Sequence, residues 1–172
     1  MTELDEFRRD KDAWFRTAQE SPLPEGARAT FAGLRYYAEA PELGFDVAPE
    51  PFDEREVIEM ETSRGDAARY ERWARVRFAV DGEAHALTVF RSMTTGGLFL
   101  PFQDANAGGE TYGAGRYLEL PELGDGRVRL DFNYAYNPYC AYDECWSCPL
   151  PPAENRLAVA IRAGERAYEA AH

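Results

Sequence analysis

The sequence predicts a mainly β fold: an antiparallel curled sheet or barrel with an N-terminal helix and an irregular Pro/Tyr-rich C-terminal loop. Three observations lead to this prediction. Roughly seven short segments alternate apolar and polar side chains, which is the period of a strand with one buried face. Turn-forming glycine, aspartate and proline residues separate these segments. Long helical segments do not follow the strands, which argues against a doubly wound parallel sheet.

Residues 1–20 contain the predicted helix. Phe7, Trp14 and Phe15 recur near helical spacing, and acidic residues occupy the first turn, where the helix dipole favours negative charge. The Ser-Pro-Leu-Pro run at 21–24 is expected to end the helix, because proline disfavours helical backbone in the residue before it.

Residues 28–134 predict a β meander. An extended stretch is expected at 29–37 and a short strand at 45–47. The further predicted strands are 56–62, 69–80, 84–91, 98–101, 115–120 and 127–134. Asp81-Gly82 predicts a two-residue hairpin turn, and Gly124-Asp125-Gly126 predicts a second hairpin between the last two strands.

We expect a single domain over residues 1–172, since a chain of this length can bury a sizeable core. Residues 135–172 form the predicted lid loop and C-terminal segment, in which proline-rich runs restrict the backbone. The conformation of residues 154–170 stays open. Apolar side chains alternate there as in a strand, and the start of the segment also fits a helix.

The charge balance excludes several function classes. The net charge is −12, and the nineteen basic residues include one lysine, Lys11. Binding to nucleic acid or to an anionic membrane is not expected, because clusters of basic side chains are missing. No apolar run approaches the roughly 20 residues of a membrane-spanning helix, and the charged N-terminus lacks a signal-like apolar segment. We therefore expect a cytoplasmic protein, with its oligomeric state left open.

Two environments explain the acidic, lysine-poor composition. In molar salt the Debye length falls to about 3 Å, so an acidic surface repels itself weakly. This favours a halophile. A GC-rich genome is the alternative, since it enriches arginine, alanine, glycine and proline without adaptation to salt.

The cysteines are spaced as Cys140-x4-Cys145-x2-Cys148. An iron–sulfur loop requires a fourth cysteine, and a zinc site would have to recruit a nearby carboxylate. A Cys140–Cys148 disulfide is geometrically possible, although a reducing cytosol disfavours it. We expect small buried hydrophobic residues here, with no metal and no cofactor.

Histidine is almost absent, so an enzyme of this sequence would depend on carboxylates for proton transfer. The candidate catalytic residues are Asp104, Glu110 and Asp131, in a hydrolase or a lyase. The structural alternative is that Asp104 and Glu110 cap backbone amides in turns. In that alternative, Asp131 pairs with an arginine across the sheet.

The leading hypothesis is a small-molecule-binding β-barrel domain. Arg116 is an isolated basic residue among tyrosines, and a guanidinium there can clamp a carboxylate or phosphate. Its alternative role is a structural arginine–aspartate pair with aromatic stacking. The expected ligand-binding residues are Tyr112, Arg116, Asn133, Tyr136 and Asn137, and the loop 137–152 would be the lid. A protein-interaction module using the Tyr/Pro-rich surface is a further alternative.

Three segments between residues 99 and 166 carry a resemblance to a known family: FLPFQDANAGGETYGAGRYLEL, LDFNYAYNPYCAY and CPLPPAENRLAVAIRAGER. They resemble the bacterial and archaeal domain-of-unknown-function family numbered 1684. The family pattern has cysteines matching Cys140 and Cys148, whereas Cys145 looks particular to this chain. The resemblance implies a compact domain and brings no activity or catalytic residue with it.

Overall fold

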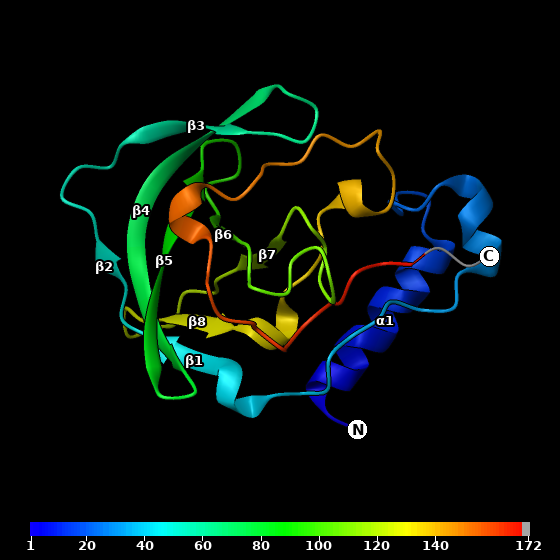
Figure 1. The fold of residues 1–172 in the computed structure, drawn as a ribbon, viewed down its shortest axis with the longest axis horizontal. Coiled ribbons are helices and arrows are strands. Elements are labelled where there is room, and N and C mark those ends of the chain that lie inside the picture. Colours follow the sequence, from blue (N-terminus) through cyan, green and yellow to red (C-terminus); the bar gives the residue numbers. More distant parts are fainter. Residues whose placement is uncertain (170–172) are drawn as a thin grey trace.

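The computed structural model describes residues 1–169 and has mainly antiparallel sheets with an N-terminal helix, as predicted (Figure 1). The helix and strands follow in the order α1 (Glu3–Thr17), β1 (Gly44–Val47), β2 (Glu50–Pro51), β3 (Val57–Glu61), β4 (Ala67–Val80), β5 (Glu83–Ser92), β6 (Leu98–Phe102), β7 (Arg116–Glu119) and β8 (Val128–Asp131). Short 3-10 helices lie at Glu25–Thr30, Pro41–Leu43, Phe132–Tyr134, Tyr139–Ala141 and Ala153–Asn155.

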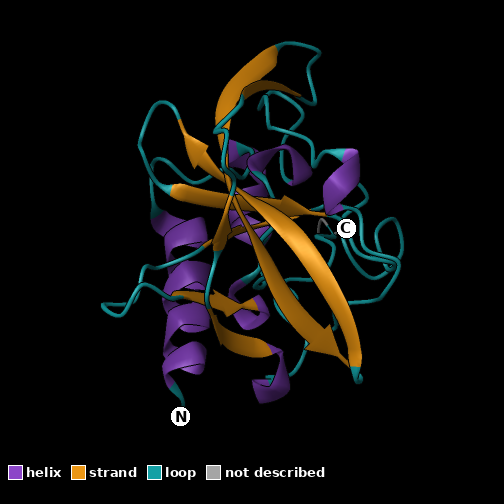
Figure 2. Cartoon of the chain, turned by 90° about the vertical axis from the view of Figure 1, so that its left-hand side faces the viewer, coloured by secondary structure: helices purple, strands orange, loops and turns teal. Residues whose placement is uncertain are grey.

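Helix α1 begins with a capping box. The Asp5 N–H donates to the Thr2 hydroxyl at 3.1 Å, and the Thr2 N–H donates to the Asp5 carboxylate at 3.0 Å. Phe15 is buried against Phe31 and Tyr142, which fixes the inner face of the helix. The helix ends before the proline-containing run, as predicted, and lies along one side of the strands (Figure 2).

The large sheet has the strand order β2-β4-β5-β6-β7, and β3 also pairs with β4. The long, curved strands β4 and β5 form the predicted hairpin, in which Val80 faces Glu83 (Figure 1). Asp81 and Gly82 have φ angles of 51° and 81°, the left-handed backbone that a tight two-residue turn requires. The local turn signal was therefore sufficient to predict this pairing.

The predicted hairpin between 115–120 and 127–134 forms only next to its turn, where Glu122 bridges Val128, and the strand 115–120 does not take part in it. Strand β7 pairs with β6, and β8 pairs with β1 in a separate two-stranded sheet. A short turn does form, since the Leu123 N–H donates to the Arg127 carbonyl at 2.7 Å. Pro121 separates this turn from β7 and has no N–H with which to continue the ladder.

The hydrogen-bonded path of the strands in residues 1–169 does not close, so a barrel is not confirmed. The C-terminal segment, orange to red in Figure 1, crosses the open side of the large sheet and buries Ile161 and Ala163. After Ala153–Asn155 this segment is largely irregular up to residue 169. It therefore forms neither the strand nor the helix that the sequence left open for residues 154–170. Residues 29–37 were expected to be extended, but residues 29 and 30 belong to the 3-10 helix Glu25–Thr30.

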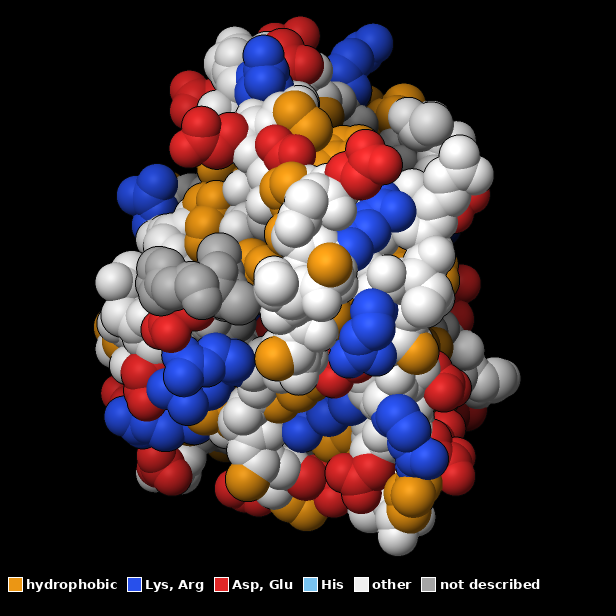
Figure 3. Space-filling model, turned by 90° about the vertical axis from the view of Figure 1, so that its right-hand side faces the viewer, with side chains coloured by type: hydrophobic (Ala, Val, Ile, Leu, Met, Phe, Trp, Pro, Cys, Tyr) orange, Lys and Arg blue, Asp and Glu red, His pale blue; other side chains and the backbone are white. Residues whose placement is uncertain are grey.

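Within the described residues, α1 is too short and too polar to cross a lipid bilayer, and no other helix is long enough. On the face drawn in Figure 3, acidic and basic side chains are interspersed among apolar ones.

Candidate functional site

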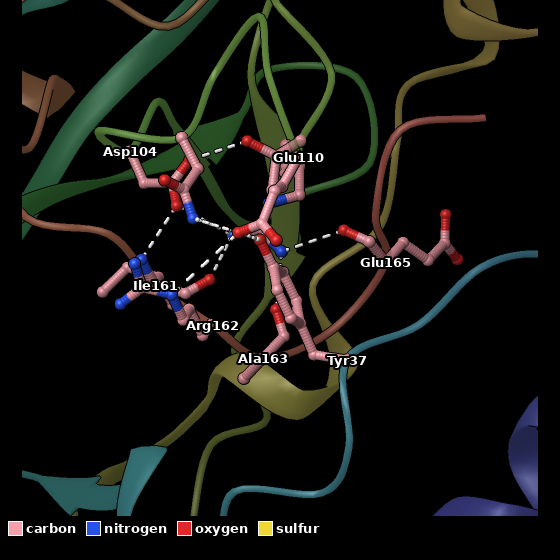
Figure 4. A network of polar contacts seen from close by, with 10 residues as sticks. Tyr37, Asp104, Glu110, Ile161, Arg162, Ala163 and Glu165 are labelled. Carbon is pink, nitrogen blue, oxygen red and sulfur yellow. Dashed lines mark hydrogen bonds and ion pairs between the residues drawn. The ribbon is translucent and has the colours of Figure 1, made fainter. Parts of the chain in front are cut away.

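Arg116, the first residue of β7, is almost completely buried, with 1% of its surface exposed. Its Nη1 donates to the Ala163 carbonyl at 2.6 Å and to the Glu165 carbonyl at 3.0 Å, and its Nη2 donates to the Ile161 carbonyl at 2.9 Å (Figure 4). Burial lowers the pKa of this guanidinium. The donors of Arg116 therefore hold the backbone of the C-terminal segment.

Asp104 completes this buried network. Its Oδ1 accepts a hydrogen bond from the Thr111 hydroxyl at 2.8 Å, and its Oδ2 accepts one from the Ile161 N–H at 2.8 Å. The Arg116 Nη2 lies 3.6 Å from Oδ2. Asp104 and Arg116 thus match the structural arginine–aspartate pair that the sequence analysis gave as the alternative role of Arg116.

Glu110 lies nearby but at the surface. Its Oε1 accepts hydrogen bonds from the Asn106 amide at 3.0 Å and the Tyr37 hydroxyl at 3.2 Å, and its Oε2 lies 3.6 Å from Arg166 Nη2 (Figure 4). Glu110 and Asp104 share no hydrogen-bond partner among the described residues.

Glu165 is a buried carboxylate that the sequence did not single out. Its Oε1 accepts hydrogen bonds from the Asn137 N–H at 3.0 Å and the Tyr142 hydroxyl at 3.0 Å, while its Oε2 pairs with Lys11 of α1. Burial and the Glu165 charge raise the pKa of Tyr142 well above its ordinary value, which keeps the hydroxyl a donor. Lys11 is the one lysine of the chain, and that rarity was the sequence feature that could have pointed to a specific carboxylate partner for it.

Asn133 and Asn137 are buried backbone anchors. The Asn133 side chain accepts from the Ala40 N–H at 2.8 Å and donates to the Ala40 carbonyl at 2.9 Å. The Asn137 amide donates to the Arg166 carbonyl at 3.0 Å. Neither residue lines the groove beside α1.

A groove of about 1010 Å³ lies between α1 and the region of β7 and β8. Its aromatic walls are Phe7, Trp14, Phe15, Tyr134, Tyr136 and Tyr139. Its charged side chains are Glu3, Asp10, Lys11, Glu119, Arg129 and Asp131. Asp131 and Tyr136 are the predicted site residues that belong to this groove.

The two cations of the groove are already paired within the protein. Lys11 bonds to Glu165, and Arg129 lies 3.2 Å from Asp46 and 3.4 Å from Asp131. The Tyr136 hydroxyl donates to Glu119, and burial together with that carboxylate raises the pKa of Tyr136. The groove therefore combines aromatic faces with an excess of carboxylates.

Tyr112 lies at a different place, against a pair of buried cysteines. Its hydroxyl is 3.5 Å from the Cys140 sulfur, and the Cys140 N–H donates to the Cys148 sulfur at 3.3 Å. Cys145 is exposed, and all three cysteines are free thiols. Within residues 1–169, no three side chains of the types that bind metals converge.

The comparisons with known proteins agree with the sequence resemblance. The chain is similar to an uncharacterised protein of Haloarcula marismortui whose solution NMR structure is known. The two are 38% identical with a TM-score of 0.70, over 95% of this chain and 91% of the other. No curated protein matches. A model of the family "Protein of unknown function (DUF1684)" matches residues 29–166, and the chain belongs to this family.

Proposed function

We propose that the protein binds a small organic ligand with a flat apolar body and a cationic group in the groove beside α1. The observation that carries the proposal is the exposure of large aromatic side chains around the groove. Phe7, Trp14 and Tyr139 are 43%, 37% and 38% exposed. Concave sites lined by aromatic side chains with a few polar groups are the usual form of small-molecule sites.

The charges on the groove favour a cation as the polar end of the ligand. Its four carboxylates, from Glu3, Asp10, Glu119 and Asp131, outnumber the paired cations of Lys11 and Arg129. Aromatic faces attract organic cations, and nearby carboxylates add to that attraction. An anion would meet repulsion here. The donors of Arg116 are bonded to backbone carbonyls, so we do not place an anionic ligand there.

The catalytic alternative has one candidate residue at this groove. Asp131 is the one predicted acid or base on its wall, and its Oδ1 accepts from the Asn133 N–H at 3.0 Å. Catalysis by carboxylates and a protein-interaction role both stay predictions.

Tryptamine and indole-3-acetate test the proposal, since they share a ring system and differ in charge. We expect tryptamine to raise the melting temperature and to bind measurably by calorimetry, with little effect of indole-3-acetate. Replacing Trp14 by alanine should weaken tryptamine binding about tenfold, because the ligand would lose a cation–π contact and the apolar contact area of the Trp14 ring.

Met93→Ala is the control. Met93 is a large apolar side chain that is 53% exposed, and it does not line the groove. Equal losses in the two variants, or equal binding of both probes, would contradict the proposal.

We also propose that the protein works in the cytoplasm at high ionic strength, on the basis of its net charge of −12. Salt screens repulsion among exposed carboxylates, so the free energy of unfolding should rise between 0.1 and about 2 M KCl. Urea titrations measure this change. A variant with Asp53, Glu54 and Glu56, all exposed, replaced by Asn or Gln should gain less from salt. An equal gain would oppose the screening explanation.

A further inference from the structure

We propose that Cys140 and Cys148 form a peroxide-reactive dithiol, a site separate from the groove, with a hydroperoxide as its substrate. Cys140 attacks the peroxide, and Cys148 resolves the product as a disulfide. The inference does not depend on the ligand proposed for the groove.

The local backbone brings the two thiols together. Cys140 lies in the 3-10 helix Tyr139–Ala141, and its N–H donates to the Cys148 sulfur at 3.3 Å. The turn after β3 holds Cys148 from the other side. The Cys148 N–H donates to the Ser63 hydroxyl at 3.1 Å, and the Ser63 N–H donates to the Cys148 carbonyl at 2.9 Å. These hydrogen bonds hold the Cys148 sulfur beside Cys140 before any reaction occurs, and the Tyr112 hydroxyl contacts the Cys140 sulfur at 3.5 Å.

The surroundings give the two thiols different roles. Hydrogen bonding from Cys148, aided by the Tyr112 hydroxyl and opposed by burial, lowers the pKa of Cys140 to about 6. The neighbouring Cys140 raises the pKa of Cys148. These surroundings favour Cys140 as the thiolate, the nucleophilic form, and Cys148 as the protonated partner. Burial and Cys140 also raise the pKa of Tyr112, which stays a donor.

The site is covered but close to the surface. Cys140 is 9% exposed, which suits a small oxidant better than a bulky one. Tyr139 and Trp146 lie on the same loop, and both are partly exposed. Their rings pack edge to face, with ring centres 5.2 Å apart. The exposed Cys145 lacks this activation, since slight desolvation and a hydrogen bond with Asp143 raise its pKa.

The reaction balances without a further co-reactant. The Cys140 thiolate attacks one oxygen of the hydroperoxide, and the O–O bond breaks. The leaving alkoxide or hydroxide takes a proton, and Cys140 becomes a sulfenic acid. The Cys148 sulfur then attacks the Cys140 sulfur, the S–O bond breaks, and hydroxide leaves with the Cys148 proton as water. The two thiols lose two electrons and the peroxide gains two.

Mass spectrometry of the intact protein after treatment with hydrogen peroxide tests the proposal. We expect the mass to fall by two hydrogens, with Cys140 and Cys148 both protected from later alkylation. Cys145→Ser should behave as the unchanged protein does. Cys148→Ser should stop at a sulfenic acid on Cys140 that dimedone labels. Tyr112→Phe should slow the reaction about tenfold through loss of its hydrogen bond.

The alternative is that both cysteines are inert packing residues. In that case Cys140 would react with peroxide no faster than Cys145, and no Cys140–Cys148 disulfide would form. Either result overturns the proposal. The pH dependence gives a second test in Cys145→Ser, where alkylation of Cys140 by iodoacetamide should be half-maximal near pH 6. A midpoint near that of an ordinary thiol, about 8.5, would also overturn it.

Discussion

Replacing Arg116 by methionine is expected to lower the free energy of unfolding by about 3–5 kcal/mol, as breaking a buried ion pair does. Methionine has a similar length and apolar stem but no donors. The carbonyls of Ile161, Ala163 and Glu165 would lose their partner, and Asp104 would stay buried without its cation. Urea denaturation followed by circular dichroism measures the loss.

Arg127→Met is the control for this experiment. Arg127 pairs with Asp125 at 2.7 Å at the surface, where an ion pair contributes roughly 0–1 kcal/mol. Arg116→Lys separates charge from geometry, since lysine keeps the charge but lacks the planar set of donors. We expect it to be nearly as destabilising as methionine. A loss in Arg116→Met no larger than that in Arg127→Met would show that the network does not hold the C-terminal segment.

The same residue shows why the site was only partly predictable. An isolated arginine among tyrosines has the local pattern of an anion clamp. The acceptors that define its surroundings come from residues 161–165, far away in the sequence. The aromatic stacking considered as its alternative role is present, with the guanidinium 5.2 Å from the centre of the Phe102 ring. Asp131 does pair with an arginine, but Arg129 lies two residues before it on the same strand, β8, and not across the sheet.

Predictions based on local signals succeeded more often than those that needed distant pairing. Helix α1 and the Asp81-Gly82 hairpin depend on neighbouring residues, and both were confirmed. The pairing of β8 with β1 joins residues 128–131 to residues 44–47, and no turn signal connects them. The buried side chains of β8, Val128 and Leu130, nevertheless follow the alternation of apolar and polar residues in the sequence, since burial requires only the period.

The groove was missed for a related reason. Phe7 and Trp14 have helical spacing with Phe15, which from sequence alone places them on a buried face. In the structure all three line the groove, but only Phe15 is buried, whereas Phe7 and Trp14 are partly exposed. An amphipathic pattern shows which face of a helix is apolar, and it does not show how much of that face the partner sheet covers.

Gly164→Ala is expected to lower the free energy of unfolding by about 2–5 kcal/mol, as the sum of two effects. Gly164 has a φ of +81°, a left-handed conformation that costs an L-residue about 1–2 kcal/mol. An added Cβ would also lie 2.7 Å from the carbonyl oxygens of Ala135 and Phe132, and such overpacking typically costs about 1–3 kcal/mol. Urea denaturation measures the sum.

Gly82→Ala separates the two effects. Gly82 also has a φ of +81°, but no atom lies within 4 Å of the place that a Cβ would take, so this variant reports the backbone cost alone. Equal losses in Gly82→Ala and Gly164→Ala would show that the carbonyls yield to the added methyl group. Gly164 lies between two carbonyls that accept from Arg116, those of Ala163 and Glu165. A clash there displaces these acceptors, so the losses in Gly164→Ala and Arg116→Met should combine to less than their sum.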